Sequence, residues 1–301
     1  MEQIVIISGS QANALAQKVA SQLGIPHYPS TIRYFPDGEL YLRLPTDVKG
    51  KKIILFESFA RRPNDALVET VFLSETLHDK GAGEVILVAP YLPYLRQDSE
   101  FNPGEIVSAK MFSTMLSKAG IDALVTVDPH LHRFKDLSEL FKMKTLKVSA
   151  MPLLAEYFYN YHQEALVVAP DEEAEQWAKL FSGKVNAPYI VLEKHRFGDT
   201  EVEVSGSIPK GTTAVIVDDI ISTGGTIVEA AEKLKEHGFT SIHVCVTHAL
   251  LVQDAEAKIF QAGVKSLIAT DTVINPYMRV SVAKIIGEAL ERLMSHVGNR
   301  A

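Results

Sequence analysis

The chain has 301 residues, of which 47% are hydrophobic and 22% charged, and its formal net charge at pH 7 is -7. This length is enough for two domains of ordinary size, each with its own core, and the composition is that of a globular protein. The negative charge argues against a nucleic-acid-binding protein, so an anionic ligand would have to be held by local groups or by metal ions.

Short apolar runs alternate with amphipathic segments along the whole chain. The predicted strands include, in order, 4–7, 52–56, 85–89, 124–127, 166–169, 214–217 and 242–246, and the predicted helices include 64–80, 106–119, 151–161 and 227–238. Strands that lack polar alternation and are joined by helices are typical of parallel sheets covered on both faces. The predicted fold class is therefore α/β.

No clear linker rich in Pro, Gly or Ser divides the chain. The best boundary lies near residues 147–149, between a strand-like run at 145–148 and the helix that follows it. We predict an amino-terminal domain over residues 1–147 and a carboxyl-terminal domain over residues 148–301. The last predicted helix, 280–297, could pack on either domain.

The single cysteine, Cys245, lies within the apolar run 242–246, which excludes a disulfide framework and a thiolate zinc site. The amino terminus leads directly into a short strand-like run and lacks the pattern of a signal peptide. Every apolar stretch is too short to cross a membrane. We therefore expect a cytoplasmic protein with no membrane partner.

Several predicted strands lead into polar residues that suit a binding site. In chain order these are Arg96-Gln97-Asp98, Asp128-Pro129-His130, Asp171 and Asp218-Asp219. Ligands of open parallel sheets bind outside the carboxyl ends of the strands. We expect these residues to form one composite site between the two domains.

The stretch AVIVDDIISTGGT, residues 214–226, combines two unlike features. The run Thr223-Gly224-Gly225-Thr226 precedes a predicted helix, and backbone N–H groups in such a place bind phosphate. Asp218 and Asp219 instead accept hydrogen bonds from hydroxyl groups, or bind a hard cation such as magnesium. A ribose 5-phosphate unit satisfies both features, because it has a phosphate at one end and a vicinal diol at the other. A Walker A loop is excluded, since no lysine follows Gly225.

This stretch resembles the phosphoribosyl pyrophosphate (PRPP) motif shared by type I phosphoribosyltransferases and PRPP synthetases. Other segments separate these two groups, and they resemble the ribose-phosphate pyrophosphokinase family. They are Phe35-Pro36-Asp37-Gly38-Glu39, similar to F-x-D-G-E, Arg96-Gln97-Asp98, similar to R-Q-D, Asp128-Pro129-His130, similar to D-L-H, and Lys194-His195-Arg196, similar to K-R-R. The segments follow the family's order along nearly the whole chain.

The resemblance implies two similar domains, each with a central, mostly parallel sheet flanked by helices as in a type I phosphoribosyltransferase. It implies a ribose-phosphate diphosphokinase, which transfers the pyrophosphoryl group of ATP to the 1-hydroxyl of ribose 5-phosphate and gives PRPP and AMP for nucleotide biosynthesis. It also implies a homo-oligomer, a dimer or a multiple of dimers, in which the Phe35 segment completes the ATP site of a neighbouring subunit.

The resemblance also gives each candidate site residue a role. The residues expected to bind ATP are Phe35, Asp37, Glu39, Arg96, Gln97 and Asp98, and those expected to hold Mg²⁺ are His130 and Asp171. The residues expected to bind ribose 5-phosphate are Asp218, Asp219, Ser222, Thr223, Gly224, Gly225 and Thr226. Lys194 and Arg196 are expected to be catalytic and to close over the phosphates.

Some positions depart from the usual family pattern. Residues 99–105 and Ser222 are nearer to archaeal-type members than to bacterial or animal ones. Glu172, Glu173 and Trp177 follow the predicted metal ligand at places where the family has smaller residues. Two extra acids close to a triphosphate would repel it unless they point away or more metal is bound.

Two other functions stay open at this point. A phosphoribosyltransferase that consumes PRPP and a base would share residues 214–226, but it would not need the Phe35 segment or the Lys194 loop. A non-catalytic regulatory subunit associated with a synthetase would be expected to lose residues of the catalytic loop or metal site, which this chain retains.

Overall fold

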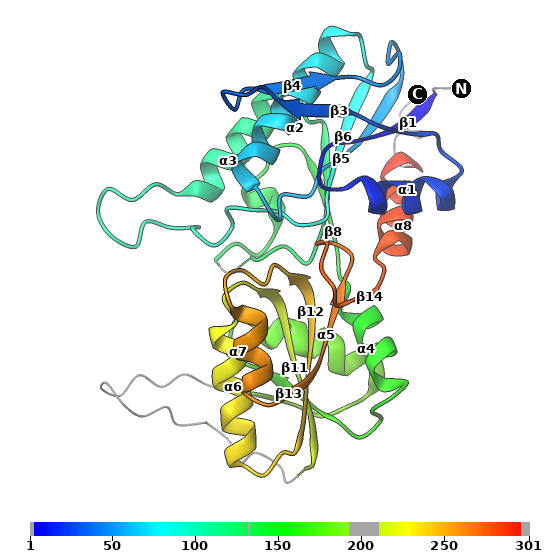
Figure 1. Cartoon of the computed structure of the whole chain (residues 1–301). Helices are drawn as coiled ribbons and strands as arrows, with labels where there is room; N and C mark the ends of the chain where they lie inside the picture. Colours follow the sequence, from blue (N-terminus) through cyan, green and yellow to red (C-terminus); the bar gives the residue numbers. More distant parts are fainter. Residues whose placement is uncertain (1–2, 132, 193–210, 296–301) are drawn as a thin grey trace. The chain divides into compact units, whose positions relative to one another are not determined.

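The computed structural model describes residues 3–131, 133–192 and 211–295, which form two compact units (Figure 1). Among the described residues, those up to 148 and those from 282 onward make up the first unit, and those between 149 and 281 make up the second. Each unit has a parallel sheet with helices packed on it, so the predicted α/β class is confirmed.

The first unit is built on a six-stranded sheet in the order β2-β1-β5-β6-β7-β8, with every pair of neighbours parallel. The strands are β1 (Ile4–Ser8), β2 (His27–Pro29), β5 (Lys52–Phe56), β6 (Glu84–Ala89), β7 (Ala123–Val127) and β8 (Lys144–Val148). The central strands are buried along nearly their whole length. That burial on both faces is why their sequences are continuous apolar runs.

The helices of the first unit are α1 (Asn13–Leu23), α2 (Pro63–Asp79), α3 (Ser108–Lys118) and α8 (Ala283–Ser295), with a short 3-10 helix, η1 (Leu137–Glu139), before β8. Helix α8 lies beside α1 and contacts β7 and β8 (Figure 1). The two helices approach closely, since a Cβ atom at Gly287 would lie 2.6 Å from Nε2 of Gln22. The last helix of the chain therefore packs on the first unit.

A separate antiparallel hairpin consists of β3 (Thr31–Tyr34) and β4 (Leu40–Arg43), which lies against α2. Tyr34 pairs with Leu40, so residues 35–39 form the turn. Gly38 has a φ of 94°, a conformation that favours glycine. The turn thus has its glycine where the backbone requires it.

The second unit repeats the plan with a six-stranded parallel sheet in the order β10-β9-β11-β12-β13-β14. Its strands are β9 (Leu166–Ala169), β10 (Tyr189–Val191), β11 (Thr213–Ile221), β12 (Ser241–Ala249), β13 (Val264–Thr270) and β14 (Met278–Val280). Its helices are α4 (Met151–Tyr159), α5 (Glu175–Val185), α6 (Gly225–Glu236) and α7 (Ala255–Gln261).

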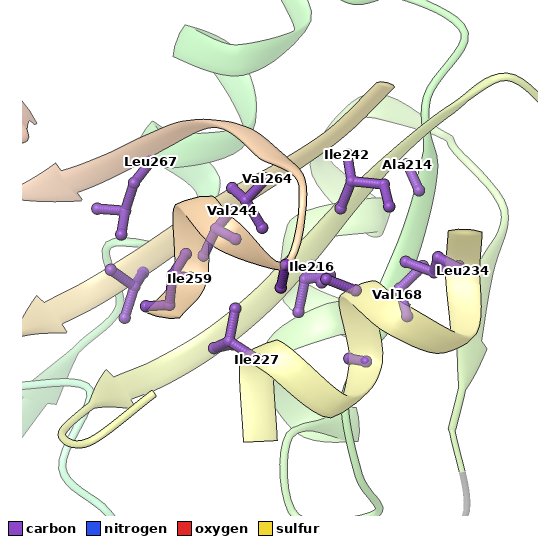
Figure 2. Close-up of a cluster of buried hydrophobic side chains, with 14 of the residues drawn as sticks. Val168, Ala214, Ile216, Ile227, Leu234, Ile242, Val244, Ile259, Val264 and Leu267 are labelled. Carbon is purple, nitrogen blue, oxygen red and sulfur yellow. The ribbon is translucent and has the colours of Figure 1, made fainter. Parts of the chain in front are cut away.

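Both faces of the second sheet are covered by apolar side chains. On one face, Ile216 and Val244 pack with Ile227 of α6 and Ile259 of α7 (Figure 2). The alternate residues of the same strands point to the other face, where Cys245 packs under α4 and α5. Burial raises the pKa of the Cys245 thiol, as expected for a structural rather than a reactive cysteine.

None of the helices within the described ranges is long and apolar enough to cross a membrane.

Candidate active site

Asp218 and Asp219 lie inside strand β11 rather than beyond its end. Asp218 pairs in parallel register with Val246 of β12, and the strand continues to Ile221. The prediction that this strand ends at Val217 was wrong, because pairing with β12 keeps the backbone extended through both acids. Asp219 is buried, with 3% of its surface exposed, and Asp218 is half-buried.

Asp218 interacts electrostatically with Asp219 and with Asp171, which follows β9. Burial, and then the charges of Asp219 and Asp171, raise the pKa of Asp218 well above its ordinary value. Oδ1 of Asp218 accepts the backbone N–H of Asp219 at 2.9 Å, and Oδ1 of Asp171 accepts that of Ala174 at 3.0 Å. A divalent cation or a set of hydroxyl donors would reduce the repulsion between these carboxylates.

The predicted phosphate loop follows directly and leads into α6, which begins at Gly225. Gly224 has a φ of 80°, a backbone conformation that requires glycine, and a Cβ atom there would also lie only 3.0 Å from Cδ1 of Ile259. The first N–H groups of an α-helix have no acceptor within the helix, and the helix dipole favours an anion beside them. Thr226 lies in this first turn. The loop is therefore suited to bind phosphate.

The loop at residues 250–252 holds the start of the phosphate loop through backbone hydrogen bonds. The N–H groups of Leu250 and Leu251 donate to the carbonyl oxygen of Ile221 at 3.0 and 3.1 Å, and the N–H of Val252 donates to that of Ser222 at 3.0 Å. Leu251 has a φ of 48°, a conformation uncommon outside glycine. Sequence analysis missed this contact because backbone hydrogen bonds leave no residue motif.

The Phe35 segment forms the exposed turn of the β3–β4 hairpin. The N–H of Phe35 donates to the carbonyl of Glu39 at 2.8 Å, and that of Gly38 donates to the carbonyl of Phe35 at 2.9 Å. Oδ1 of Asp37 accepts the N–H of Glu39 at 3.1 Å. The ring of Phe35 is 40% exposed, so it is available to stack on a planar ligand.

Arg33 supports the ring of Phe35 and was not singled out from the sequence. Its guanidinium lies 4.0 Å from the ring centroid of Tyr41 and 5.0 Å from that of Phe35, within cation–π range of both. Arg33 and Tyr41 are paired across the two strands. This cross-strand neighbour could have been found only by predicting the hairpin register.

In the segment Arg96-Gln97-Asp98, the three side chains have different surroundings. Arg96 is exposed, and Oε1 of Gln97 accepts a hydrogen bond from Oγ of Ser108, at the start of α3, at 2.6 Å. Asp98 is buried and is held by Arg133, whose Nε lies 3.3 Å from its carboxylate and whose backbone N–H donates to it at 3.2 Å. Asp98 thereby ties this segment to the residues that follow β7.

His130 lies half-buried in the segment that follows β7. Asp128, just before it, is buried and has a φ of 36°, an unusual backbone conformation for a non-glycine residue. Strain of this kind is found at functional sites. Among the residues that the structure describes, no group of three or more His, Cys, Asp or Glu side chains is arranged to hold a metal ion. Magnesium commonly uses only one or two carboxylates together with substrate phosphates, so the residues present fit a metal that arrives with its nucleotide.

The acids and the tryptophan after Asp171 take different positions. Glu172 and Glu173 are exposed. Trp177 lies on α5 and is buried among apolar residues of the second unit, with 7% of its surface exposed. The tryptophan is therefore a core residue of the second unit.

The predicted site residues thus fall into two groups. The first unit carries Phe35, Asp37, Glu39, Arg96, Gln97, Asp98 and His130, and the second carries Asp171, Asp218, Asp219 and residues 222–226. The structure brings the second group together at β11, and it links residues 96–98 to the segment after β7 through Arg133. Lys194 and Arg196 lie outside the described residues.

Comparison with known proteins shows the family to which the chain belongs. The protein-family model of the N-terminal domain of ribose phosphate pyrophosphokinase matches residues 4–120, and the family model of the phosphoribosyl transferase domain matches residues 138–271. A ribose-phosphate pyrophosphokinase of Methanothermobacter thermautotrophicus is 40% identical over 289 residues, which are 95% of this chain and 100% of that relative. The chain belongs to the ribose-phosphate pyrophosphokinase family.

Other relatives of the ribose-phosphate pyrophosphokinase family agree with this result. Ribose-phosphate pyrophosphokinase 1 of Archaeoglobus fulgidus is 35% identical over 290 residues, covering 95% of this chain and 100% of its own. The crystal structure of phosphoribosylpyrophosphate synthetase from Mycobacterium smegmatis superimposes with a TM-score of 0.88 at 25% identity, over 98% of this chain and 100% of that one. The predicted family, with its archaeal-type features, and the predicted class of enzyme are confirmed.

Proposed function

We propose that this pyrophosphokinase transfers the β,γ-pyrophosphoryl group of ATP to the 1-hydroxyl of ribose 5-phosphate, giving PRPP and AMP. The observation that carries the proposal is the continuous run in the second unit from Asp218 and Asp219 of β11 to the glycine turn that opens α6. A phosphate site and a diol site adjoin each other there, as ribose 5-phosphate requires.

Ribose 5-phosphate is held at both ends. Its phosphate accepts hydrogen bonds from the backbone N–H groups and hydroxyls of residues 222–226, next to the positive end of the α6 dipole. Asp218 and Asp219 accept hydrogen bonds from the ribose hydroxyls. Because the sugar is fixed at two points, its 1-hydroxyl is oriented before ATP reacts, which lowers the entropic part of the barrier.

The reaction is an in-line displacement at the β-phosphorus of ATP. The 1-hydroxyl oxygen attacks that phosphorus and releases its proton to solvent. The bond from the β-phosphorus to the oxygen bridging to the α-phosphorus breaks, and AMP leaves with that oxygen. Lys194 and Arg196 neutralise the charge that develops on the transferred phosphates.

ATP is held by residues of the first unit. The exposed ring of Phe35 stacks on the adenine, Asp37 and Glu39 accept hydrogen bonds from its amino group, and Arg96 contacts phosphate oxygens, with Gln97 and Asp98 beside it. His130 and Asp171 are the residues that would hold Mg²⁺, which when bound supplies charge neutralisation on the triphosphate. In the assembled homo-oligomer, the Phe35 turn is contributed by a neighbouring subunit.

The release of AMP tests this function. Purified protein is incubated with ATP and Mg²⁺, with and without ribose 5-phosphate, and AMP and PRPP are measured. Equal amounts of AMP and PRPP, formed only when ATP, ribose 5-phosphate and Mg²⁺ are all present, are expected. A protein that instead consumed PRPP and a base would be a phosphoribosyltransferase, and one inactive in both assays would be a non-catalytic subunit.

A further inference from the structure

Two glutamates that the proposed reaction does not use lie buried in the first unit. Glu57 directly follows β5 and is 0% exposed, and Glu69 lies on α2 and is 1% exposed. Within the part of the chain that the structure describes, neither carboxyl group forms an ion pair with a lysine, arginine or histidine. Without a cationic partner, two carboxyl groups this deeply buried are unfavourable if both carry a negative charge.

The two carboxyl groups converge on one backbone N–H group. The N–H of Ser10 donates to Oε2 of Glu57 at 3.0 Å and to Oε2 of Glu69 at 3.2 Å. Oε1 of Glu57 accepts the N–H groups of Gln11 and Ser58, at 3.1 and 3.0 Å. Both Oε2 atoms thus share a single donor, whereas Oε1 of Glu57 is fully used by two others.

A shared proton resolves the repulsion between two carboxyl groups that accept the same N–H group, because one carboxyl then donates to the other. Burial first, and then the charge and hydrogen bond of Glu69, raise the pKa of Glu57 well above its ordinary value. The backbone around the pair is fitted to it, since a Cβ atom at Gly9 would lie 1.7 Å from Oε2 of Glu57. Only glycine fits there.

The other oxygen of Glu69 reaches the hairpin. Oε1 accepts hydrogen bonds from Oγ of Ser10 at 3.0 Å and from the hydroxyl of Tyr34 at 3.2 Å. Tyr34 is the last residue of β3 and immediately precedes Phe35. The guanidinium of Arg62 lies 5.1 Å from the centroid of the Tyr34 ring, so this side chain is held at both its ring and its hydroxyl.

We infer that Glu57 and Glu69 share one proton, and that Glu69, fixed in this way, acts through Tyr34 to position the hairpin turn that carries Phe35. The nucleotide part of this inference rests on the proposed function, whereas the shared proton does not. Glu57, Glu69 and Tyr34 are positioning residues here, since none of them is proposed to touch ATP.

The pair makes a defined contribution to the pH dependence of folding. Because the pKa of Glu57 is raised in the folded state, its contribution to stability is complete below the unfolded pKa and is lost as the pH rises through the folded pKa. Glu69 is the charged group that acts on Glu57, and Glu69, Arg62 and Asp65 are those that act on Tyr34. The pKa of Tyr34 is itself raised, first by burial and then by Glu69.

The shared proton is tested with Glu57→Gln, which is neutral at every pH. Its amide oxygen can still accept from Gln11 and Ser58, and its NH₂ group can donate to Glu69. The matched control is Glu75→Gln, an exposed glutamate on α2, the helix that carries Glu69. We expect thermal stability of the wild type and of Glu75→Gln to fall as the pH rises above the ordinary glutamate range, and that of Glu57→Gln to fall less.

Infrared spectroscopy supplies a second readout of the same proton. The wild type at neutral pH should show the C=O stretching band of a buried protonated carboxyl group, and Glu57→Gln should lack it. Equal pH dependence of stability in the wild type and Glu57→Gln, or the absence of this band from the wild type, would overturn the shared proton. Neither measurement uses substrate, so their outcome is independent of the proposed reaction.

The positioning role is tested with Tyr34→Phe, which removes only the hydroxyl bonded to Glu69. Loss of one such hydrogen bond predicts a KM for ATP about three- to tenfold higher, with kcat and the KM for ribose 5-phosphate within about twofold of wild type. Tyr28→Phe, on the exposed strand β2, is the control and should be unchanged. An unchanged KM for ATP in an active, folded Tyr34→Phe protein would refute the positioning role, whereas a wild type without activity would refute the proposed function instead.

Discussion

Gly224 and Gly225 are adjacent in the sequence, but the structure places different demands on them. Gly224 has a φ of 80° and a neighbour, Ile259, where a Cβ atom would lie. Gly225 begins α6, and a Cβ atom there would meet nothing within 4 Å. The fold requires glycine at position 224. At position 225 the fold tolerates a side chain, and the open space is available to a ligand.

Substitution by alanine should separate these two demands. Gly224→Ala should lower the free energy of unfolding by about 1–2 kcal/mol, because a left-handed backbone is unfavourable for alanine. Gly225→Ala should be as stable as the wild type or up to about 1 kcal/mol more stable. Thermal or urea denaturation measures both. Equal destabilisation by the two substitutions would contradict the loop geometry.

The catalytic assignment of Lys194 is also made at the scale of one residue. Lys194→Ala should lower kcat by roughly a hundredfold or more, while the KM for ATP changes by less than about threefold, because the lysine acts mainly on the transition state. Lys142→Ala, an exposed lysine near the amino end of β8, is the control. Steady-state kinetics with an unchanged kcat for Lys194→Ala would rule out this role.

Between elements, the link from Asp98 to Arg133 joins the segment before α3 to the segment after β7. Arg133→Ala leaves a buried carboxylate without its side-chain partner, so we expect a loss of about 1–3 kcal/mol in the free energy of unfolding. The KM for ATP should rise, while the KM for ribose 5-phosphate should not.

A double-mutant cycle with Asp98→Asn isolates this link. If the two side chains stabilise one another, the second substitution should cost less in the Arg133→Ala background than in the wild type. Strictly additive free energies of unfolding would show that the ion pair contributes nothing to the positions of these segments.

Sequence analysis predicted best the strands that are buried on both faces of a sheet. Strands β5 and β9 were predicted with their observed limits, because a strand buried on both faces is a simple apolar run. Strand β11 was predicted too short, because burial of Asp219 depends on its neighbours in space. The β3–β4 hairpin and the short helix α7 have weaker periodic patterns and were not predicted as elements.

The same distinction applies to the candidate site. The phosphate loop and the acids before it could be predicted, because their chemistry is contiguous in the sequence. Arg133 and the pair of Glu57 and Glu69 could not, because each acts on a residue from another segment. Contacts of this kind are decided by the topology of the first sheet, which no local motif encodes.

At the scale of the whole molecule, the two units have the same parallel-sheet architecture, and the proposed substrate-binding residues are divided between them. The first unit carries the residues proposed for ATP and the second carries those proposed for ribose 5-phosphate. The chain also crosses back, since α8 belongs to the first unit. A change in either unit should therefore affect one substrate more than the other.

Mixing inactive variants tests whether a neighbouring subunit supplies the Phe35 turn. Phe35→Ala and Lys194→Ala should each be nearly inactive alone. If the turn acts between subunits, the Phe35 and the Lys194 of one chain belong to two different active sites. In randomly mixed dimers, about a quarter of the wild-type activity should return, since half the dimers are mixed and each regains one intact site. No recovery after subunit exchange would show that both residues serve the same chain's site.

The most direct test of the central claim is a crystal structure of the protein with ribose 5-phosphate. We predict the phosphate on the turn formed by residues 223–226, at the amino end of α6, and the ribose hydroxyls within hydrogen-bonding distance of Asp218 and Asp219. A sugar phosphate bound elsewhere on the chain, with this turn and these acids making no contact to it, would contradict the account.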